Sequence, residues 1–91
     1  MTTTSDENRP VLYTKPGCFP CRKTLQKFQE AGIEPRVVDL TENPAALEYV
    51  TEELGYSQAP IVVVDDDFHW SGLDPVSIER AIHSLSRSTA R

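Results

Sequence analysis

The strongest constraint on this fold is the placement of its only two cysteines, Cys18 and Cys21. A short apolar run at residues 11–14 precedes them and has the pattern of a buried strand. Cys21, Leu25 and Phe28 then recur at the spacing of a helix. Two thiols at a strand-to-helix junction can cycle between a dithiol and a disulfide. The pattern therefore indicates electron transfer through sulfur.

The composition limits the partners and the location. A chain of 91 residues fits one domain, and its 14 acids and 9 bases give a net charge of -5. This charge disfavours nucleic acid and anionic membrane as partners, because both require a cationic face. Residues 1–9 are polar and contain no secretory signal, and no apolar run approaches the ~20 residues of a membrane span. We therefore expect a cytoplasmic location. We also expect the protein to be a monomer.

Turn and capping residues divide the chain into seven elements. The expected strands are residues 11–14, 36–40, 61–64 and 68–70, and the expected helices begin near Cys18, at Asn43-Pro44 and at Asp74-Pro75. Gly32 and Gly55 are the expected ends of the first two helices. Leu47, Val50 and Leu54 are expected on one face of the second helix.

The order β-α-β-α-β-β-α predicts an α/β fold. The first two strands should be parallel and the last two an antiparallel hairpin, which gives a four-stranded mixed sheet flanked by three helices. One domain should span residues 10–86, between a disordered tail at residues 1–9 and a frayed end at residues 87–91.

The chemistry of the pair follows from its place at a helix start. Unpaired backbone N–H groups and the helix dipole face Cys18, and Lys15, Arg22 and Lys23 add positive charge. Such surroundings lower a thiol pKa from about 8.5 towards about 7. Cys18 is then the nucleophile and Cys21 the resolving cysteine.

The two residues between the cysteines, Phe19 and Pro20, tune this pair. Pro20 has no N–H and so removes one donor that could stabilise the Cys18 thiolate. A less stabilised thiolate makes the dithiol a stronger reductant. We therefore expect an electron donor rather than an oxidant of folding proteins.

Three other uses of the cysteines compete with this one. A structural disulfide closing so short a loop would contribute only about 2 kcal/mol and is rare in the cytoplasm. A single C-x-x-C is half of a zinc site, and His69 and His83 are both distant from it in sequence. The third alternative is two unrelated buried cysteines. We expect no metal site.

Residues 13–21, Tyr-Thr-Lys-Pro-Gly-Cys-x-x-Cys, resemble the active-site segment of the glutaredoxin-like branch of the thioredoxin fold. The resemblance extends from about Val11 to Leu85. It implies that Pro60 is the family's cis-proline, facing the redox pair. The backbone of Ala59 would then be free to pair with an extended substrate segment.

Two segments are more specific within this branch. Gln58-Ala59-Pro60 resembles the corresponding stretch of the NrdH-type redoxins, whereas glutathione-using glutaredoxins usually carry Thr-Val-Pro. Residues 69–72, His69-Trp70-Ser71-Gly72, resemble the start of the NrdH sequence Trp-Ser-Gly-Phe-Arg-Pro. This chain departs from those redoxins at Phe19-Pro20, where many have Val-Gln, and at Leu73-Asp74, in place of Phe-Arg.

The NrdH resemblance implies a small electron donor to the large subunit of class Ib ribonucleotide reductase. Thioredoxin reductase would re-reduce it with electrons from NADPH, and no cofactor would be bound. The alternatives are a glutathione- or mycothiol-dependent glutaredoxin, or a module that binds a metal or an iron–sulfur cluster between two chains.

Some candidate site residues allow two interpretations. Trp70 is either a core residue or part of a partner-docking groove with Ser71 and Gly72. Gln58 contacts either solvent or substrate. Lys15 is either an ordinary surface lysine or a contributor to thiolate electrostatics. Asp74 is most simply a helix N-cap.

Overall fold

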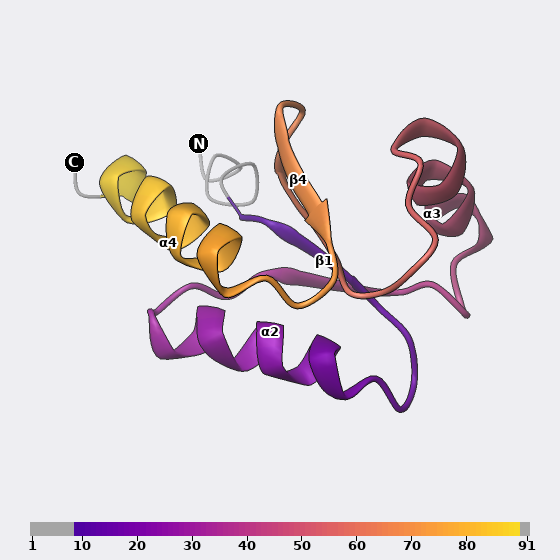
Figure 1. The fold of residues 1–91 in the computed structure, drawn as a ribbon, viewed down its shortest axis with the longest axis horizontal. Coiled ribbons are helices and arrows are strands. Elements are labelled where there is room, and N and C mark those ends of the chain that lie inside the picture. Colours follow the sequence, from indigo (N-terminus) through magenta and orange to yellow (C-terminus); the bar gives the residue numbers. More distant parts are fainter. Residues whose placement is uncertain (1–8, 90–91) are drawn as a thin grey trace, which may run out of the picture.

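Four short strands form one mixed sheet in the order β2-β1-β3-β4 (Figure 1). The computed structural model describes residues 9–89, so the predictions for residues 1–8 and 90–91 lie outside it. Its elements are β1 (Val11–Thr14), α2 (Phe19–Glu30), β2 (Arg36–Asp39), α3 (Pro44–Glu48), the π-helical turn η1 (Tyr49–Glu53), β3 (Ile61–Asp65), β4 (Phe68–Ser71) and α4 (Pro75–Thr89). None of the described helices has the length and apolar character needed to cross a membrane.

The predicted fold class and element order are confirmed. β1 is central, parallel to β2 and antiparallel to β3, and β4 returns antiparallel to β3. The strand ends differ from the predicted ones by one residue. β2 ends at Asp39, β3 extends to Asp65, and β4 extends to Ser71. α4 continues past the predicted domain end at residue 86 to Thr89.

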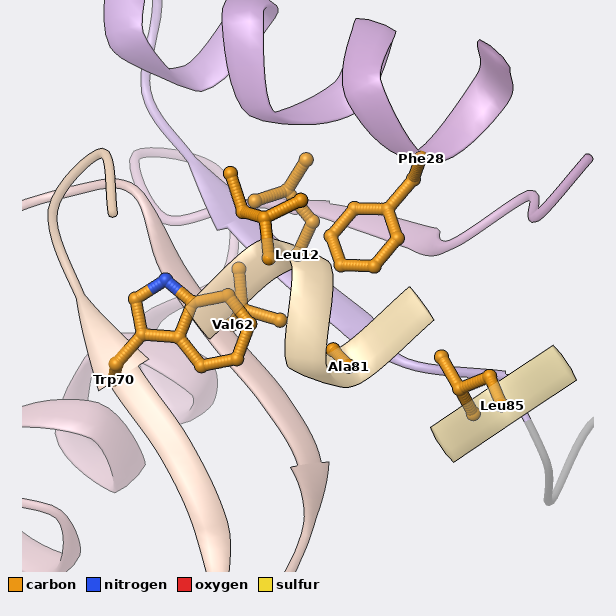
Figure 2. Packing of buried hydrophobic residues seen from close by; sticks show 7 residues of the cluster. Leu12, Phe28, Val62, Trp70, Ala81 and Leu85 are labelled. Atoms are coloured by element: carbon orange, nitrogen blue, oxygen red, sulfur yellow. The ribbon is translucent and has the colours of Figure 1, made fainter. Parts of the chain in front are cut away.

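The sheet separates two apolar clusters because successive strand residues point to opposite faces. In β1, Leu12 packs on the face covered by α2 and α4, and Tyr13 packs on the face covered by α3 and η1 (Figure 1). The larger cluster is shown in Figure 2 and consists of Leu12, Phe28, Val62, Trp70, Ile78, Ala81 and Leu85. This packing fixes α2, and with it the cysteines, against the central strand.

Local sequence sets both ends of α2. Cys18 is the N-cap, with Pro20 in the first turn, where a missing N–H costs no helical hydrogen bond. At the other end, Gly32 takes a φ of +80°, and the Ile33 N–H donates to the Phe28 carbonyl at 2.9 Å. This is the glycine-dependent helix stop that the sequence predicted.

The second helix differs from its prediction. α3 is regular only through Glu48, and a π-helical turn, η1, carries the chain to Glu53. The wider turn rotates the following residues relative to α3. Val50 is fully buried, whereas Leu47 is 46% exposed. Both residues line one surface groove, as expected for residues on one face of this helix, and they differ in burial.

The predicted N-caps of the last two helices are confirmed. The Asn43 side chain accepts a hydrogen bond from the Ala46 N–H at 3.1 Å. Asp74 accepts from the Ser77 N–H at 3.3 Å and from the Ser77 hydroxyl at 2.9 Å. These hydrogen bonds from Ser77 lower the pKa of the Asp74 carboxyl below its ordinary value, because they favour the ionised form.

Candidate active site at Cys18 and Cys21

Cys18 and Cys21 form a disulfide at the N-terminal end of α2, with their Cα atoms 5.2 Å apart. The turn before them depends on Gly17, whose φ of +71° lies in the left-handed region that a residue without Cβ adopts readily. Both cysteines are almost buried in the disulfide form, with 6% of Cys18 and 3% of Cys21 exposed. The pair is thus rigidly placed, with Cys18 slightly nearer to solvent.

A backbone N–H at the helix start faces the sulfur of Cys18. The Cys21 N–H donates to Cys18 Sγ at 3.2 Å. Pro20, between them, offers no such donor. The buried Thr24 hydroxyl donates to the Pro20 carbonyl at 2.9 Å and holds the first turn. The effect of Pro20 on the Cys18 thiolate stays a prediction.

A surface hollow of about 190 Å3 opens beside the disulfide. Its lining includes both sulfur-bearing residues, the cations Lys15 and Arg22, and Val37 of β2. Phe19 stands at the same helix start, 60% exposed, with the Arg22 guanidinium carbon 5.9 Å from its ring centre. Client side chains that approach the sulfurs would therefore meet both positive charge and apolar surface.

Val37 was missed in the sequence analysis, although half of it (51%) is exposed beside the site. It pairs in parallel register with Leu12, whose side chain lies on the face covered by α2. Once β2 is placed beside β1, strand alternation puts Val37 on that same face. The missing information was the register rather than the residue type.

The two segments that resembled NrdH redoxins lie together in the fold. The Ser71 hydroxyl donates to the Gln58 carbonyl at 2.6 Å, and the Gly72 N–H donates to the Pro60 carbonyl at 2.7 Å. The Ala59-Pro60 peptide bond is cis, as the resemblance implied. Hydrogen bonds from the end of β4 thus hold the loop that contains Gln58, Ala59 and Pro60.

A second groove, of about 210 Å3, runs along this loop and the α3 side of the sheet. Lys15, Tyr56, Gln58 and Ala59 are among its lining residues. Within the described chain, neither the N–H nor the carbonyl of Ala59 has a backbone partner, so both remain available to an extended peptide. Lys15 lines this groove and the hollow at the disulfide, and so lies between the two.

Trp70 lies in the core rather than on an exposed groove. Only 7% of it is exposed, and it packs in the cluster of Figure 2 with Leu12 and Val62. Its indole Nε1 is buried and has no hydrogen-bond partner among the described residues. The position agrees with the core interpretation, and the buried ring is not placed to line a partner-docking groove. The neighbouring His69 contacts the Tyr56 hydroxyl through Nδ1 at 2.8 Å.

Metal binding has no further support from the side chains. Among the described residues, no group of three or more His, Cys, Asp or Glu side chains is placed to hold a metal ion.

Comparisons with known proteins agree with this geometry. The Glutaredoxin family model matches residues 11–69. The Gene 56 proteins of Mycobacterium phages D29 and L5 are 39% and 38% identical over 78 residues, 86% of this chain, and the match covers 87% and 76% of those proteins.

Solved structures show the same architecture. NrdH-redoxin from Escherichia coli superposes with a TM-score of 0.73 at 29% identity, over 79% of this chain and 92% of that one. A thioredoxin-like protein superposes with a TM-score of 0.74 over 80% of this chain and 99% of that one, and at 19% identity it supports the fold alone.

Proposed function

The chain belongs to the glutaredoxin family and is a thiol-disulfide oxidoreductase with a thioredoxin fold, and we propose that it is a small dithiol electron carrier of the NrdH type. The observation that carries the proposal is the Cys18–Cys21 disulfide at the start of α2. The contact between the two NrdH-like segments, through Ser71 and Gln58, supports the narrower assignment.

The proposed reaction moves two electrons from the dithiol to a client disulfide. The Cys18 thiolate attacks one client sulfur, which forms a mixed disulfide and releases a client thiolate that takes up a proton. Cys21 loses its proton and attacks Cys18 Sγ. The Cys18–Cys21 disulfide then forms, the mixed disulfide breaks, and the second client sulfur leaves as a thiol.

Residues around the pair are proposed to bind the client and tune the thiolate. Lys15 contributes positive charge beside the sulfurs, and Pro20 limits the donors to Cys18. The free N–H and carbonyl of Ala59 support pairing with an extended client segment. The loop made by Gln58 and Pro60 borders that segment, and Ser71 and Gly72 hold the loop in place.

We propose that NADPH-dependent thioredoxin reductase supplies the electrons and that the large subunit of class Ib ribonucleotide reductase receives them in the cytoplasm. The support is the likeness to the E. coli NrdH-redoxin, a glutaredoxin-like protein described as having a thioredoxin-like activity profile. Asp74, which stands where NrdH redoxins have Arg, is already used as the N-cap of α4.

The test couples the purified protein to NADPH, thioredoxin reductase and a protein disulfide, and follows NADPH consumption. We expect turnover with the wild-type protein and none with Cys18→Ser. Turnover with glutathione or mycothiol and its reductase, but none with thioredoxin reductase, would instead assign the chain to the thiol-dependent glutaredoxins.

A Cys21→Ser variant identifies the client. It retains the attacking sulfur but lacks the resolving one, so we expect it to remain bound to its client as a mixed disulfide that a reductant releases. The matched Cys18→Ser variant should trap nothing. Visible absorbance or bound iron in the freshly purified protein would instead support the iron–sulfur alternative.

A further inference from the structure

The basic residues of this acidic chain are concentrated at its redox site. Residues 15–29 contain four lysine or arginine side chains and no aspartate or glutamate. The whole chain has a net charge of -5, to which this segment contributes +4, so the rest carries -9. The segment that carries the cysteines is therefore cationic, although the chain as a whole is acidic.

The four cations border the disulfide and the helix that carries it. Lys15 and Arg22 line the hollow that contains both cysteines, and no carboxylate lines it. Lys23 and Lys27, one helical turn apart, line a groove of about 420 Å3 between α2 and α4, together with the exposed Leu73. We call this second feature the α2–α4 groove.

In the part of the chain that the structure describes, no carboxylate lies within salt-bridge distance of these four cations. Glu30 and Glu79 line the α2–α4 groove as well, so the lining of that groove has mixed charge. Among the described residues, the charged side chains that line the hollow at the sulfurs are Lys15 and Arg22, both cations. Charges more than about 8 Å away are largely screened at physiological ionic strength, so the charges nearest the sulfurs act most strongly on an approaching segment.

Large apolar side chains accompany the cations. Phe19 is 60% exposed, Val37 51% and Leu73 42%, and each lies beside the hollow, the helix start or the α2–α4 groove. Interfaces commonly combine an apolar centre with a charged rim. The surface around the disulfide has both parts.

From this arrangement we propose that the client segment carrying the disulfide is acidic, with carboxylates flanking its cysteines. The inference rests on the proposed function, because it identifies the substrate class of the same dithiol. Opposite charge raises the rate of encounter and disfavours like-charged partners. A basic segment would meet Lys15 and Arg22 at the point where the sulfurs must come into contact, and Lys23 and Lys27 farther along α2.

The test uses the chemically reduced full-length protein and three synthetic disulfide peptides. They share one Cys-x-x-Cys core and carry Glu, Gln or Lys at the flanking positions. At physiological ionic strength, where only nearby charges act strongly, we expect second-order reduction of the Glu peptide to be severalfold faster than that of the Lys peptide. In about 0.5 M NaCl the two rates should converge.

Charge-reversal variants locate the effect. Lys27→Glu, at an exposed position of α2, should lower the ratio of the Glu-peptide rate to the Lys-peptide rate, and Lys23→Glu serves as the second variant. Arg80→Glu is the matched control, because it makes the same charge change on α4, where Arg80 packs over Phe68 rather than near the disulfide. The control should keep the wild-type ratio.

The rate ratio is insensitive to a general change in thiol reactivity, since both peptides react with the same sulfur. Equal rates for the Glu and Lys peptides at physiological ionic strength, with normal reduction of the Gln peptide, would overturn the inference and leave the proposed function standing. An equal loss of preference in Arg80→Glu would also overturn it. Failure to reduce any of the peptides would count against the proposed function itself.

Discussion

The hydroxyl of Ser71, the last residue of β4, donates to the carbonyl of Gln58 at 2.6 Å. The two residues are 13 positions apart, and the bond connects the edge strand to the loop that contains cis-Pro60. A second bond from Gly72 to Pro60 lies next to it. Hydrogen bonds from the end of the edge strand β4 therefore hold the loop that is proposed to bind the client.

The first prediction concerns this bond. Ser71→Ala should lower the free energy of unfolding by about 1 kcal/mol, the usual contribution of one hydrogen bond, measured by urea denaturation. It should also raise KM for a protein disulfide more than it lowers kcat, because the loop is displaced and the sulfurs are not. Ser71→Thr retains the hydroxyl and serves as the control. Unchanged KM and unchanged stability in Ser71→Ala would contradict the assignment.

The second prediction concerns Pro20. Pro20→Ala restores a backbone N–H in the first turn of α2 and should stabilise the Cys18 thiolate. The dithiol should then become a weaker reductant, with a redox potential raised by about 30 mV, the equivalent of about 1.4 kcal/mol. Equilibration with a glutathione buffer measures the potential. Pro75→Ala, at the start of α4, makes the same change away from the sulfurs and should leave the potential unaltered.

The third prediction separates the two interpretations of Trp70. Trp70→Ala should destabilise the fold by about 3–5 kcal/mol, because it empties a large core position. Trp70→Phe should cost much less, since it keeps an aromatic ring and removes the buried Nε1 donor that lacks a partner. Reduction of protein clients should persist in Trp70→Phe. A folded Trp70→Phe variant that has lost client affinity would restore the docking interpretation.

The fourth prediction concerns the acid limit of stability. Hydrogen bonds from Ser77 lower the pKa of Asp74 in the folded chain below its ordinary 3.8. A group with a lowered folded pKa stabilises the fold above its unfolded pKa and loses that contribution as the pH falls through the folded value. Stability should therefore fall below about pH 4. Asp74→Asn, which can still cap the helix but does not titrate, should show a weaker decrease in thermal midpoint on acidification.

Most of the fold was predictable because the sequence signals for its strands and helix ends are local. Each of these signals determines the conformation of only a few neighbouring residues. They are the apolar run of β1, the Pro and Asn or Asp residues at helix starts, and Gly32 after α2. The clearest difference from the predicted elements is in the second helix, where a π-helical turn follows α3. A sequence pattern based on the regular helical repeat does not show such a turn, since an extra residue in one turn depends on what packs against it.

By itself, the sequence determined the redox pair, the element order and the charge of the segment around the cysteines, because residue identity and spacing carry all three. Only the tertiary structure decided which distant residues meet: Ser71 with Gln58, Val37 with the disulfide hollow, and Trp70 with the core rather than the surface. These contacts depend on strand register and on the side of the sheet that each helix covers. Register is fixed by packing across the whole sheet, so no single segment of the sequence specifies it.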